Sequence, residues 1–336
     1  MKLINHSNSM HTYKVKRKIN KFKLIEYIIV ILFLSLITGF LYEAISNNKI
    51  VTSNKIKNKI VTINGSKIQY NTQGQGSFTV VLESDMGMTN QEWSKVLKAA
   101  PKDMRLFYYD RAGLGKSEST EKEVTPETEA KELYKILNKA GLNGPYILVG
   151  NGYGSLITQE FINLYKDDVG GVVFVDGYTN EDIQSNEFKK ENKNQITKLK
   201  SQKLLSRVGI TRAMDKFNVI KYPKGLLEGL SESDAELYRN YRVTGSFCET
   251  FLNERESLAS LKVNNLSEGA LEDKPVFVIT SRKEEQLERQ KEFLKLSSKS
   301  EINSLEDNNI LIPLEKPETI VNAIKSVSKK IPKTTN

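Results

Sequence analysis

The order of apolar and polar positions predicts a regular alternation of strands and helices from residue 60 to about residue 330. Two short predicted strands, residues 60–63 and 66–70, flank Asn64-Gly65, and this dipeptide predicts a hairpin because both central positions of such a turn require a positive φ. Five further runs are mainly apolar, which is typical of strands in a sheet that is covered on both faces. These runs lie at residues 78–82, 105–109, 146–149, 172–175 and 275–280.

Helical periodicity fills the intervals between these runs. The clearest helix is predicted at residues 126–140, with Pro126 at its start and Gly141 just beyond its end. Strands that alternate with helices predict an α/β fold with a mostly parallel, doubly wound sheet. The remaining predicted elements are helices at residues 155–165, 284–297 and 317–329, and a short strand at 300–305.

Residues 178–270 interrupt this alternation. They are strongly charged, contain few β-branched runs, and have the pattern of several amphipathic helices. Because the block lies between two predicted strands of one sheet, we expect an inserted helical cap above the strand ends. The main domain is then predicted to extend over residues 60–330.

Residues 24–45 form the most apolar segment of the chain. Its central part, residues 27–42, carries no charge and is bracketed by Glu26 and Glu43. Since a bilayer-spanning helix needs about 20 apolar residues, we expect a single transmembrane anchor here. A cleaved signal peptide is the alternative, with Ala44-Ile45-Ser46 as its cleavage site, although the segment before it is long for such a peptide.

The charges on the two sides of this anchor predict its orientation. Residues 1–23 carry seven basic residues and no acidic one, whereas the polar linker at residues 46–59 carries four lysines. By the positive-inside rule we expect a cytoplasmic tail and a main domain on the outer side of the cell membrane. Seven of the nine net positive charges lie in this tail, so the composition does not predict a nucleic-acid partner. We expect membrane lipid to be the partner of residues 24–45.

Histidine and cysteine are nearly absent, and this restricts the chemistry. His6 and His11 both lie in the basic tail, and Cys248 is the only cysteine. A disulfide framework and a thiolate metal cluster are therefore excluded. Because no dense acidic cluster suggests an all-oxygen metal site either, we expect neither a metal nor a cofactor.

A glycine-rich corner at residues 150–154 follows one predicted strand and precedes a predicted helix. One interpretation is a dinucleotide-binding loop, with Asp176 as the acid that ends the next strand. The third glycine of that motif is replaced by Ser155, however, and the strand does not open the fold. The other interpretation is a nucleophile elbow whose central position is Gly152.

Residues 110–117 come close to a phosphate-binding loop. The motif requires a glycine five residues before Gly115, and Asp110 occupies that position. A tight turn from a strand into a loop explains this stretch better than nucleotide binding.

Five segments in the right order resemble the α/β-hydrolase superfamily. They extend over residues 80–87, 109–118, 144–154, 172–176 and 312–318. The resemblance covers residues 60–330 and implies an α/β-hydrolase fold. It also implies acyl transfer on ester or amide bonds by a serine, a histidine and an acid, with backbone N–H groups that hold the oxyanion.

When the superfamily's catalytic positions are carried over to this chain, the triad is incomplete. The serine position falls on Gly152 and the histidine position on Ile310, and no histidine follows residue 11. The acid position falls near Glu284. Ser155 lies one residue too far into the helix for its hydroxyl to replace the missing nucleophile.

The resemblance places the oxyanion-binding N–H groups at Tyr153 and near Met86. Asp85 stands where relatives usually have glycine. A carboxylate about 4 Å from a developing oxyanion would oppose it by roughly 4 kcal/mol at an effective dielectric constant of about 20. If Asp85 points inward, the oxyanion hole is lost as well.

The usual serine-hydrolase mechanism is therefore excluded. We expect a membrane-anchored pseudoenzyme that binds a small-molecule or protein ligand in its cleft, with Asp85, Met86 and Tyr153 among the lining residues. A hydrolase that uses Asp85 and Glu284 as an acid–base pair is one alternative. A structural or signalling domain whose cleft is filled is the other.

Overall fold

An eight-stranded sheet forms the centre of the computed structural model, which describes residues 21–52, 58–261, 266–308 and 310–332. The strand order is β1-β2-β4-β3-β5-β6-β7-β8. Only β1 with β2 and β2 with β4 pair antiparallel, so the predicted mostly parallel sheet is confirmed. The strands are β1 (Lys59–Ile63), β2 (Ser66–Gln73), β3 (Thr79–Glu83), β4 (Arg105–Tyr109), β5 (Tyr146–Asn151), β6 (Val169–Val175), β7 (Val276–Thr280) and β8 (Ser300–Ser304).

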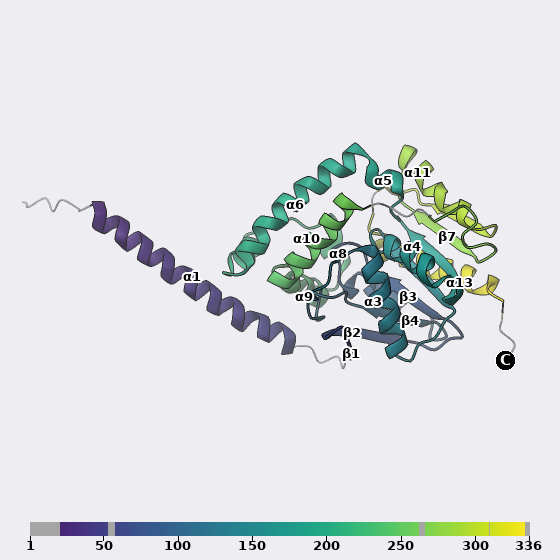
Figure 1. The fold of residues 1–336 in the computed structure, drawn as a ribbon, viewed down its shortest axis with the longest axis horizontal. Coiled ribbons are helices and arrows are strands. Elements are labelled where there is room, and N and C mark those ends of the chain that lie inside the picture. The colour runs from purple at the N-terminus through teal and green to yellow at the C-terminus, as the bar shows by residue number, and fades with distance from the viewer. Residues whose placement is uncertain (1–20, 53–57, 262–265, 309, 333–336) are drawn as a thin grey trace, which may run out of the picture.

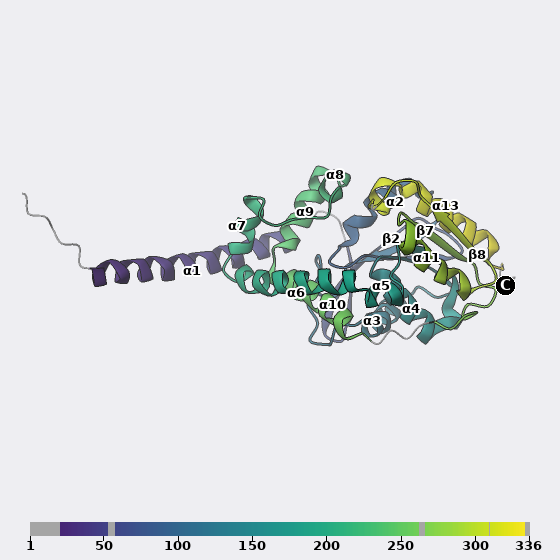
Figure 2. The same cartoon turned by 90° about the horizontal axis from the view of Figure 1, so that it is seen from above.

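Helices cover both faces of this sheet (Figures 1 and 2). Helices α3 (Pro126–Lys139) and α4 (Gly154–Tyr165) lie on one face, and α2 (Ser94–Ala99) and α13 (Pro317–Lys330) lie on the other. The helices predicted at 126–140, 155–165 and 317–329 are thereby confirmed to within one residue at each end.

Alternate side chains of each strand enter two separate cores, because successive residues of a strand point to opposite faces. Val81 and Leu148 pack into the core beneath α3 and α4. Val80 and Val149 pack into the core beneath α2 and α13. The continuous apolar runs of the sequence thus correspond to strands that are buried on both sides.

In the described part of the block between β6 and β7, six helices lie at the position of the expected cap. Helices α6 and α10 lie against each other along much of their length (Figure 1). Tyr238 and Phe247 join the block to the body through a third apolar cluster that includes Met88 and Leu114. The cap helices are α5 (Asn180–Gln184), α6 (Asn186–Ser206), α7 (Ile210–Lys216), α8 (Leu226–Gly229), α9 (Glu232–Arg242) and α10 (Gly245–Ser260).

The remaining helical elements are short. The helix predicted at residues 284–297 is α11 (Glu284–Gln290), which continues as the 3-10 helix η3 (Lys291–Leu296). The others are η1 (Asn90–Trp93), η2 (Lys166–Asp168) and α12 (Ile312–Glu315).

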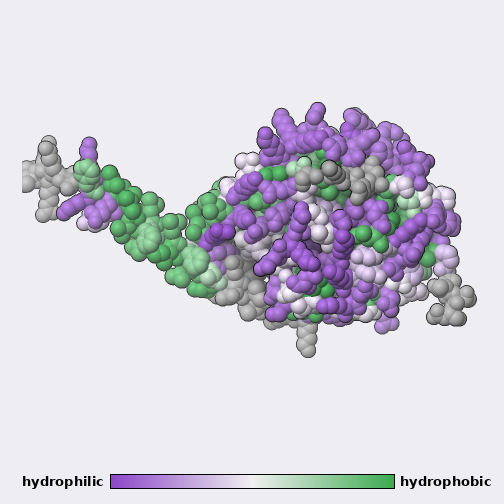
Figure 3. Space-filling model, viewed as in Figure 1, coloured by the Kyte–Doolittle hydropathy of each residue, from purple (hydrophilic) through white to green (hydrophobic). Residues whose placement is uncertain are grey.

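Helix α1 (Lys21–Thr52) protrudes from the domain as an apolar rod (Figure 3). Its part from Lys21 to Ser46 is long and apolar enough to cross a membrane. The helix continues to Thr52, through the first half of the linker predicted at residues 46–59. Residues 46–52 contain no glycine or proline, the two residue types that oppose a helix most strongly. Residues 1–20, most of the predicted tail, lie outside the described residues.

Candidate functional site

The turn between β5 and α4 has the geometry of a nucleophile elbow. Strand β5 ends at Asn151, and α4 begins at Gly154. Between them, Gly152 has a φ of +49°, a left-handed conformation that glycine adopts without steric cost. Its N–H group donates to the carbonyl oxygen of Val175 at 3.1 Å, which fixes the turn against β6. The turn thus has the backbone of an elbow, with glycine at the position that the family resemblance assigns to the nucleophile.

The carboxylate of Asp85 lies at this elbow. Its Oδ1 atom accepts the backbone N–H of Tyr153 at 2.7 Å and the backbone N–H of Met86, also at 2.7 Å. These are the two N–H groups that the sequence places in the oxyanion hole. One oxygen of the protein itself therefore occupies the position in which a hydrolase would hold the oxyanion of its intermediate.

The same carboxylate leaves no room for a side chain on Gly152. A Cβ atom built on this glycine would overlap Oδ1 of Asp85. Ser155 does not substitute for the nucleophile, because its buried hydroxyl donates to the carbonyl of Gly152 at 2.7 Å and accepts the N–H of Tyr178 at 2.8 Å. Its role is to hold the start of α4.

Glu92 is the second carboxyl of this site, and no sequence motif pointed to it. Its Oε2 atom accepts the backbone N–H of Asp85 at 2.9 Å, and its Oε1 atom accepts the side-chain amide of Asn151 at 2.7 Å. Burial and the neighbouring Asp85 carboxylate raise the pKa of Glu92 to about 8. Burial also raises the pKa of Asp85, whereas its two N–H donors lower it. We place the charge of the pair on Asp85, because those donors favour the ionised form.

A buried guanidinium group lies directly behind the elbow. Arg111 forms ion pairs with Glu83 at 3.0 Å, Glu129 at 3.4 Å and Glu254 at 2.8 Å, and its side chain is 3% exposed. It also donates to the carbonyl of Asp85 at 2.8 Å. Burial raises the pKa of each of the three carboxyls, and the attraction of Arg111 opposes this increase. The cluster is therefore a buried network of ion pairs that holds the loop after β3 in place.

Glu254 also connects the cap to this loop. It is fully buried on α10, and its Oε2 atom accepts the N–H of Gly87 at 2.7 Å. The hydroxyl of Tyr238 on α9 donates to the carbonyl of the same glycine at 2.9 Å. The ring of Phe251 packs so closely on Gly87 that a Cβ atom there would lie 2.7 Å from it. Side chains of the cap thus pack directly on the loop after β3, which carries Asp85.

Two predicted site residues take no part in the hydrogen bonds of this centre. Glu284 is exposed at the first residue of α11, whereas Asp85 is only partly exposed and its carboxylate is bonded at the elbow. Asp85 and Glu284 are therefore not the pair of carboxyls that we expected. The carboxyl next to Asp85 is that of Glu92. Ile310 is partly buried and packs against the core beneath α2 and α13.

The acid of the dinucleotide interpretation has a different role. The carboxylate of Asp176 accepts the N–H of Ser281 at 2.9 Å and its hydroxyl at 2.7 Å, and it also accepts the hydroxyl of Thr280 at 2.8 Å. Asp176 thus connects the ends of β6 and β7.

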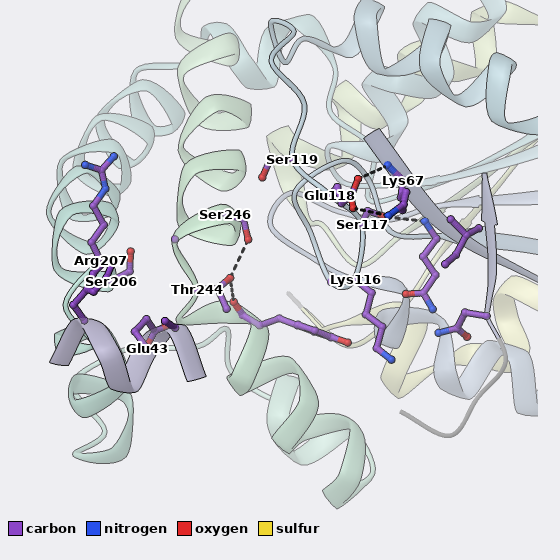
Figure 4. A pocket seen from close by; sticks show the side chains of 18 residues that line it. Glu43, Lys67, Lys116, Ser117, Glu118, Ser119, Ser206, Arg207, Thr244 and Ser246 are labelled. Carbon is purple, nitrogen blue, oxygen red and sulfur yellow. Dashed lines mark hydrogen bonds and ion pairs between the residues drawn. The ribbon is translucent and has the colours of Figure 1, made fainter. Parts of the chain in front are cut away.

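A cavity of about 1090 Å³ lies elsewhere, between the outer end of α1, the cap and the loop at residues 115–119 (Figure 4). Among the described residues, neither this cavity nor three smaller ones is lined by Asp85, Glu92 or Gly152. In the same part of the chain, no three His, Cys, Asp or Glu residues are placed to hold a metal ion.

The residues that sequence reasoning missed share one property. Glu92, Arg111 and Glu254 are charged side chains in charged or polar surroundings of the sequence, where exposure is the default expectation. Arg111 follows Asp110 in the near-match to a phosphate-binding loop, which is a partial signal. For Glu92 and Glu254 no local pattern distinguishes the buried carboxyl from exposed neighbours.

Comparison with solved structures shows which fold this is. The Cif epoxide hydrolase from Acinetobacter nosocomialis superposes with a TM-score of 0.66 and 16% identity over 85% of this chain and 96% of its own. An esterase from Thermogutta terrifontis superposes with a TM-score of 0.61 and 18% identity over 82% and 100%. The chain has the α/β-hydrolase fold, so the resemblance noted in the sequence is confirmed.

Sequence relatives match only part of the chain. The uncharacterized protein YqjL of Bacillus subtilis is 31% identical over 35% of this chain and 47% of its own length. An AB hydrolase superfamily protein of Gibberella zeae is 31% identical over 29% and 31%. An uncharacterized vacuolar membrane protein of Saccharomyces cerevisiae is 29% identical over 30% and 16%. The chain thus spans less than half the length of these relatives, and no family model matches it.

Proposed function

We propose that this chain, which has the α/β-hydrolase fold, is a membrane-anchored pseudoenzyme that acts by binding rather than by acyl transfer. The observation that carries the proposal is the position of Asp85, whose Oδ1 atom accepts the N–H groups of both Met86 and Tyr153. A substrate carbonyl cannot use these donors while the carboxylate is there. Gly152 and Ile310 at the nucleophile and histidine positions point the same way.

The test is activity-based labelling of the full chain in lipid nanodiscs. We expect no covalent labelling by a fluorophosphonate probe and no turnover of p-nitrophenyl esters above the buffer rate. The matched control is Ser155→Ala, which removes the serine closest to the elbow in sequence. Labelling of the native chain that disappears in Ser155→Ala would contradict the proposal.

The filled elbow directs binding away from the centre of the hydrolase fold. A small-molecule or protein ligand in the cleft would have to displace Phe251 and break the contact of Glu254 with Gly87. This favours the surface of the closed domain as the binding site and a protein as the partner. Pull-down by the native chain and by an Asp85→Ala variant separates the two sites, since only a partner in the cleft responds to the change at Asp85.

The anchor and its orientation belong to the same proposal. Helix α1 supplies the candidate span, Lys21–Ser46, and the basic residues before it favour a cytoplasmic N-terminus with the main domain outside. A cysteine introduced at exposed Asn322 should react with a membrane-impermeant maleimide on intact cells. Reaction only after lysis would place the domain on the inner side.

One alternative enzyme function has a specific observation in its favour. Asp85 and Glu92 are adjacent carboxyls of which one carries a pKa of about 8, a combination that is frequent in acid–base catalysis. This function requires an activity that Asp85→Asn abolishes and that has a bell-shaped pH profile. The hydrogen bonds that already occupy both carboxyls argue against it.

A further inference from the structure

One corner of the cap exposes large apolar side chains. It consists of the C-terminal end of α6, all of α7 and the residues just after it. Phe217 is 76% exposed, Leu204 66% and Val219 54%, and Ile210 is also exposed. Exposed apolar side chains clustered at one corner are typical of surfaces that contact a partner or a membrane.

The chain around this corner is strongly basic. Residues 186–221 contain ten lysine and arginine residues and three acidic ones. Lys200 and Lys203 pair with glutamates of α10, but Lys198, Arg207 and Lys216 are exposed. Apolar side chains surrounded by cations match the chemistry of an anionic bilayer surface, which attracts the charges and accepts the apolar groups.

Contacts with α1 bring this corner to the outer end of the candidate span. Arg212 of α7 forms an ion pair with Glu43, with nitrogen–oxygen distances of 2.9 and 3.0 Å, and Glu43 is 4% exposed. The backbone at Val208 lies against Gly39 so closely that a Cβ atom on the glycine would overlap the carbonyl of Val208. Figure 1 shows the C-terminal end of α6 beside the outer half of α1, and Figure 2 shows α7 next to the same part of α1.

The level of these contacts fits the bilayer interface. Gly39 precedes Ile45, the end of the apolar segment, by six residues, which corresponds to about 9 Å along a helix. Interfacial side chains typically penetrate about 5–10 Å into the boundary between headgroups and acyl chains. The large cavity lies along the same stretch of α1: Phe40 and Ala44 line it on the α1 side, and Lys116 and Arg207 are among its other lining residues (Figure 4).

We infer that the α6–α7 corner of the cap rests on the anionic surface of the membrane that holds α1, with Phe217, Leu204, Ile210 and Val219 inserted at its interface. The cap then has two attachments, one to the body through Glu254 and one to the bilayer. This inference rests on the anchoring part of the proposed function and is independent of the absence of catalysis.

Site-specific fluorescence in nanodiscs tests the inference on the full chain. The only native cysteine, Cys248, is buried, so a cysteine introduced at Phe217 can be labelled selectively with an environment-sensitive dye. The nanodiscs contain phosphatidylcholine and phosphatidylglycerol with a fraction of headgroup-proximal spin-labelled lipid. We expect quenching at Phe217→Cys at least about threefold stronger than at Asn322→Cys, an exposed position on α13.

Two further variants make each outcome decisive. Leu41→Cys, an exposed position near the outer end of the apolar segment, reports on the span itself: quenching at residue 41 without quenching at 217 overturns the inference and leaves the anchor intact. No quenching at either position overturns both. Arg207→Glu combined with Lys216→Glu, two exposed charges, should reduce the quenching at 217 at least about twofold in anionic nanodiscs. If the dye at residue 217 is shielded from water only when the protein self-associates, the corner is a protein interface, and the inference is overturned.

Discussion

The Oδ1 atom of Asp85 lies 2.7 Å from the backbone nitrogen of Tyr153, the residue that follows the elbow glycine. It also accepts the N–H of Met86, so one carboxylate oxygen satisfies both donors that the family resemblance assigns to the oxyanion hole. Preorganised donors of this kind supply much of the rate enhancement in hydrolases. Here both donors bind a carboxylate of the same chain.

Restoring a side chain at the elbow should destabilise the protein. We expect Gly152→Ser to lower the free energy of unfolding by about 2–4 kcal/mol, because a left-handed conformation and overlap with Asp85 add together. Urea unfolding of the full chain in detergent measures this. Gly141→Ser is the matched control, since Gly141 has a φ of +70° but open space around it, and it should cost only about 1 kcal/mol.

The same experiment identifies Asp85 as the obstacle. In Gly152→Ser with Asp85→Ala, the loss should be smaller than the sum of the two single losses by at least about 1 kcal/mol, as expected for residues in contact. Strict additivity would show that the carboxylate can move aside at no cost.

Catalysis should require removal of Asp85 as well as replacement of the missing side chains. Gly152→Ser with Ile310→His should restore little labelling by a fluorophosphonate probe. Adding Asp85→Gly frees both N–H donors and should raise the labelling rate at least about tenfold, within the usual contribution of one oxyanion donor. Robust activity in the double variant alone would show that Asp85 does not block the hole.

The fold could be predicted from the sequence because its evidence is local. Continuous apolar runs, the Asn64-Gly65 turn and Pro126 each act within a few residues, and the strands and helices followed. The end of α1 at Thr52 was less predictable, because residues 46–52 are polar but contain neither glycine nor proline, the residue types that oppose a helix most strongly.

The candidate site could be predicted only in part. The absence of a catalytic serine at Gly152 and of any histidine after residue 11 is a matter of composition and motif position. The position of the Asp85 carboxylate could not be predicted from the sequence. Neither could the contact of Glu254 with Gly87, because the two residues are 167 positions apart in the chain. A buried glutamate on an amphipathic helix has the same local pattern as an exposed one, so its partner decides its environment.

The Asp85–Glu92 pair should make stability depend on pH. The pKa of Glu92 is raised from an ordinary 4.5 to about 8 in the folded protein, so the folded state holds a proton that the unfolded chain releases. Stability should therefore fall as pH rises from about 4.5 to about 8, by at most about 1.4 kcal/mol per pH unit. Urea midpoints measured from pH 5.5 to 8.5 should show a flatter profile for Glu92→Gln, whose amide cannot ionise. Parallel profiles for the two proteins would contradict the assignment.

Loss of the buried cation should be the most damaging of these substitutions. We expect Arg111→Met to lower the free energy of unfolding by about 3–5 kcal/mol at pH 7, because it leaves Glu83, Glu129 and Glu254 buried without a positive charge. Lys131→Met, which removes the exposed partner of Glu127, is the control and should cost less than about 1 kcal/mol.

The defect should also release the cap, since Arg111 and Gly87 share Glu254 as a partner. Hydrogen exchange of the Gly87 N–H should accelerate in Arg111→Met and in the milder Glu254→Gln, while amides in α3 exchange at the native rate in Glu254→Gln.

Burial of three carboxyls raises their pKa values, so protonation relieves the unpaired charge at low pH. The loss in Arg111→Met should therefore grow between pH 5 and pH 8, and a loss that is constant with pH would show that packing, rather than charge, explains the effect of Arg111.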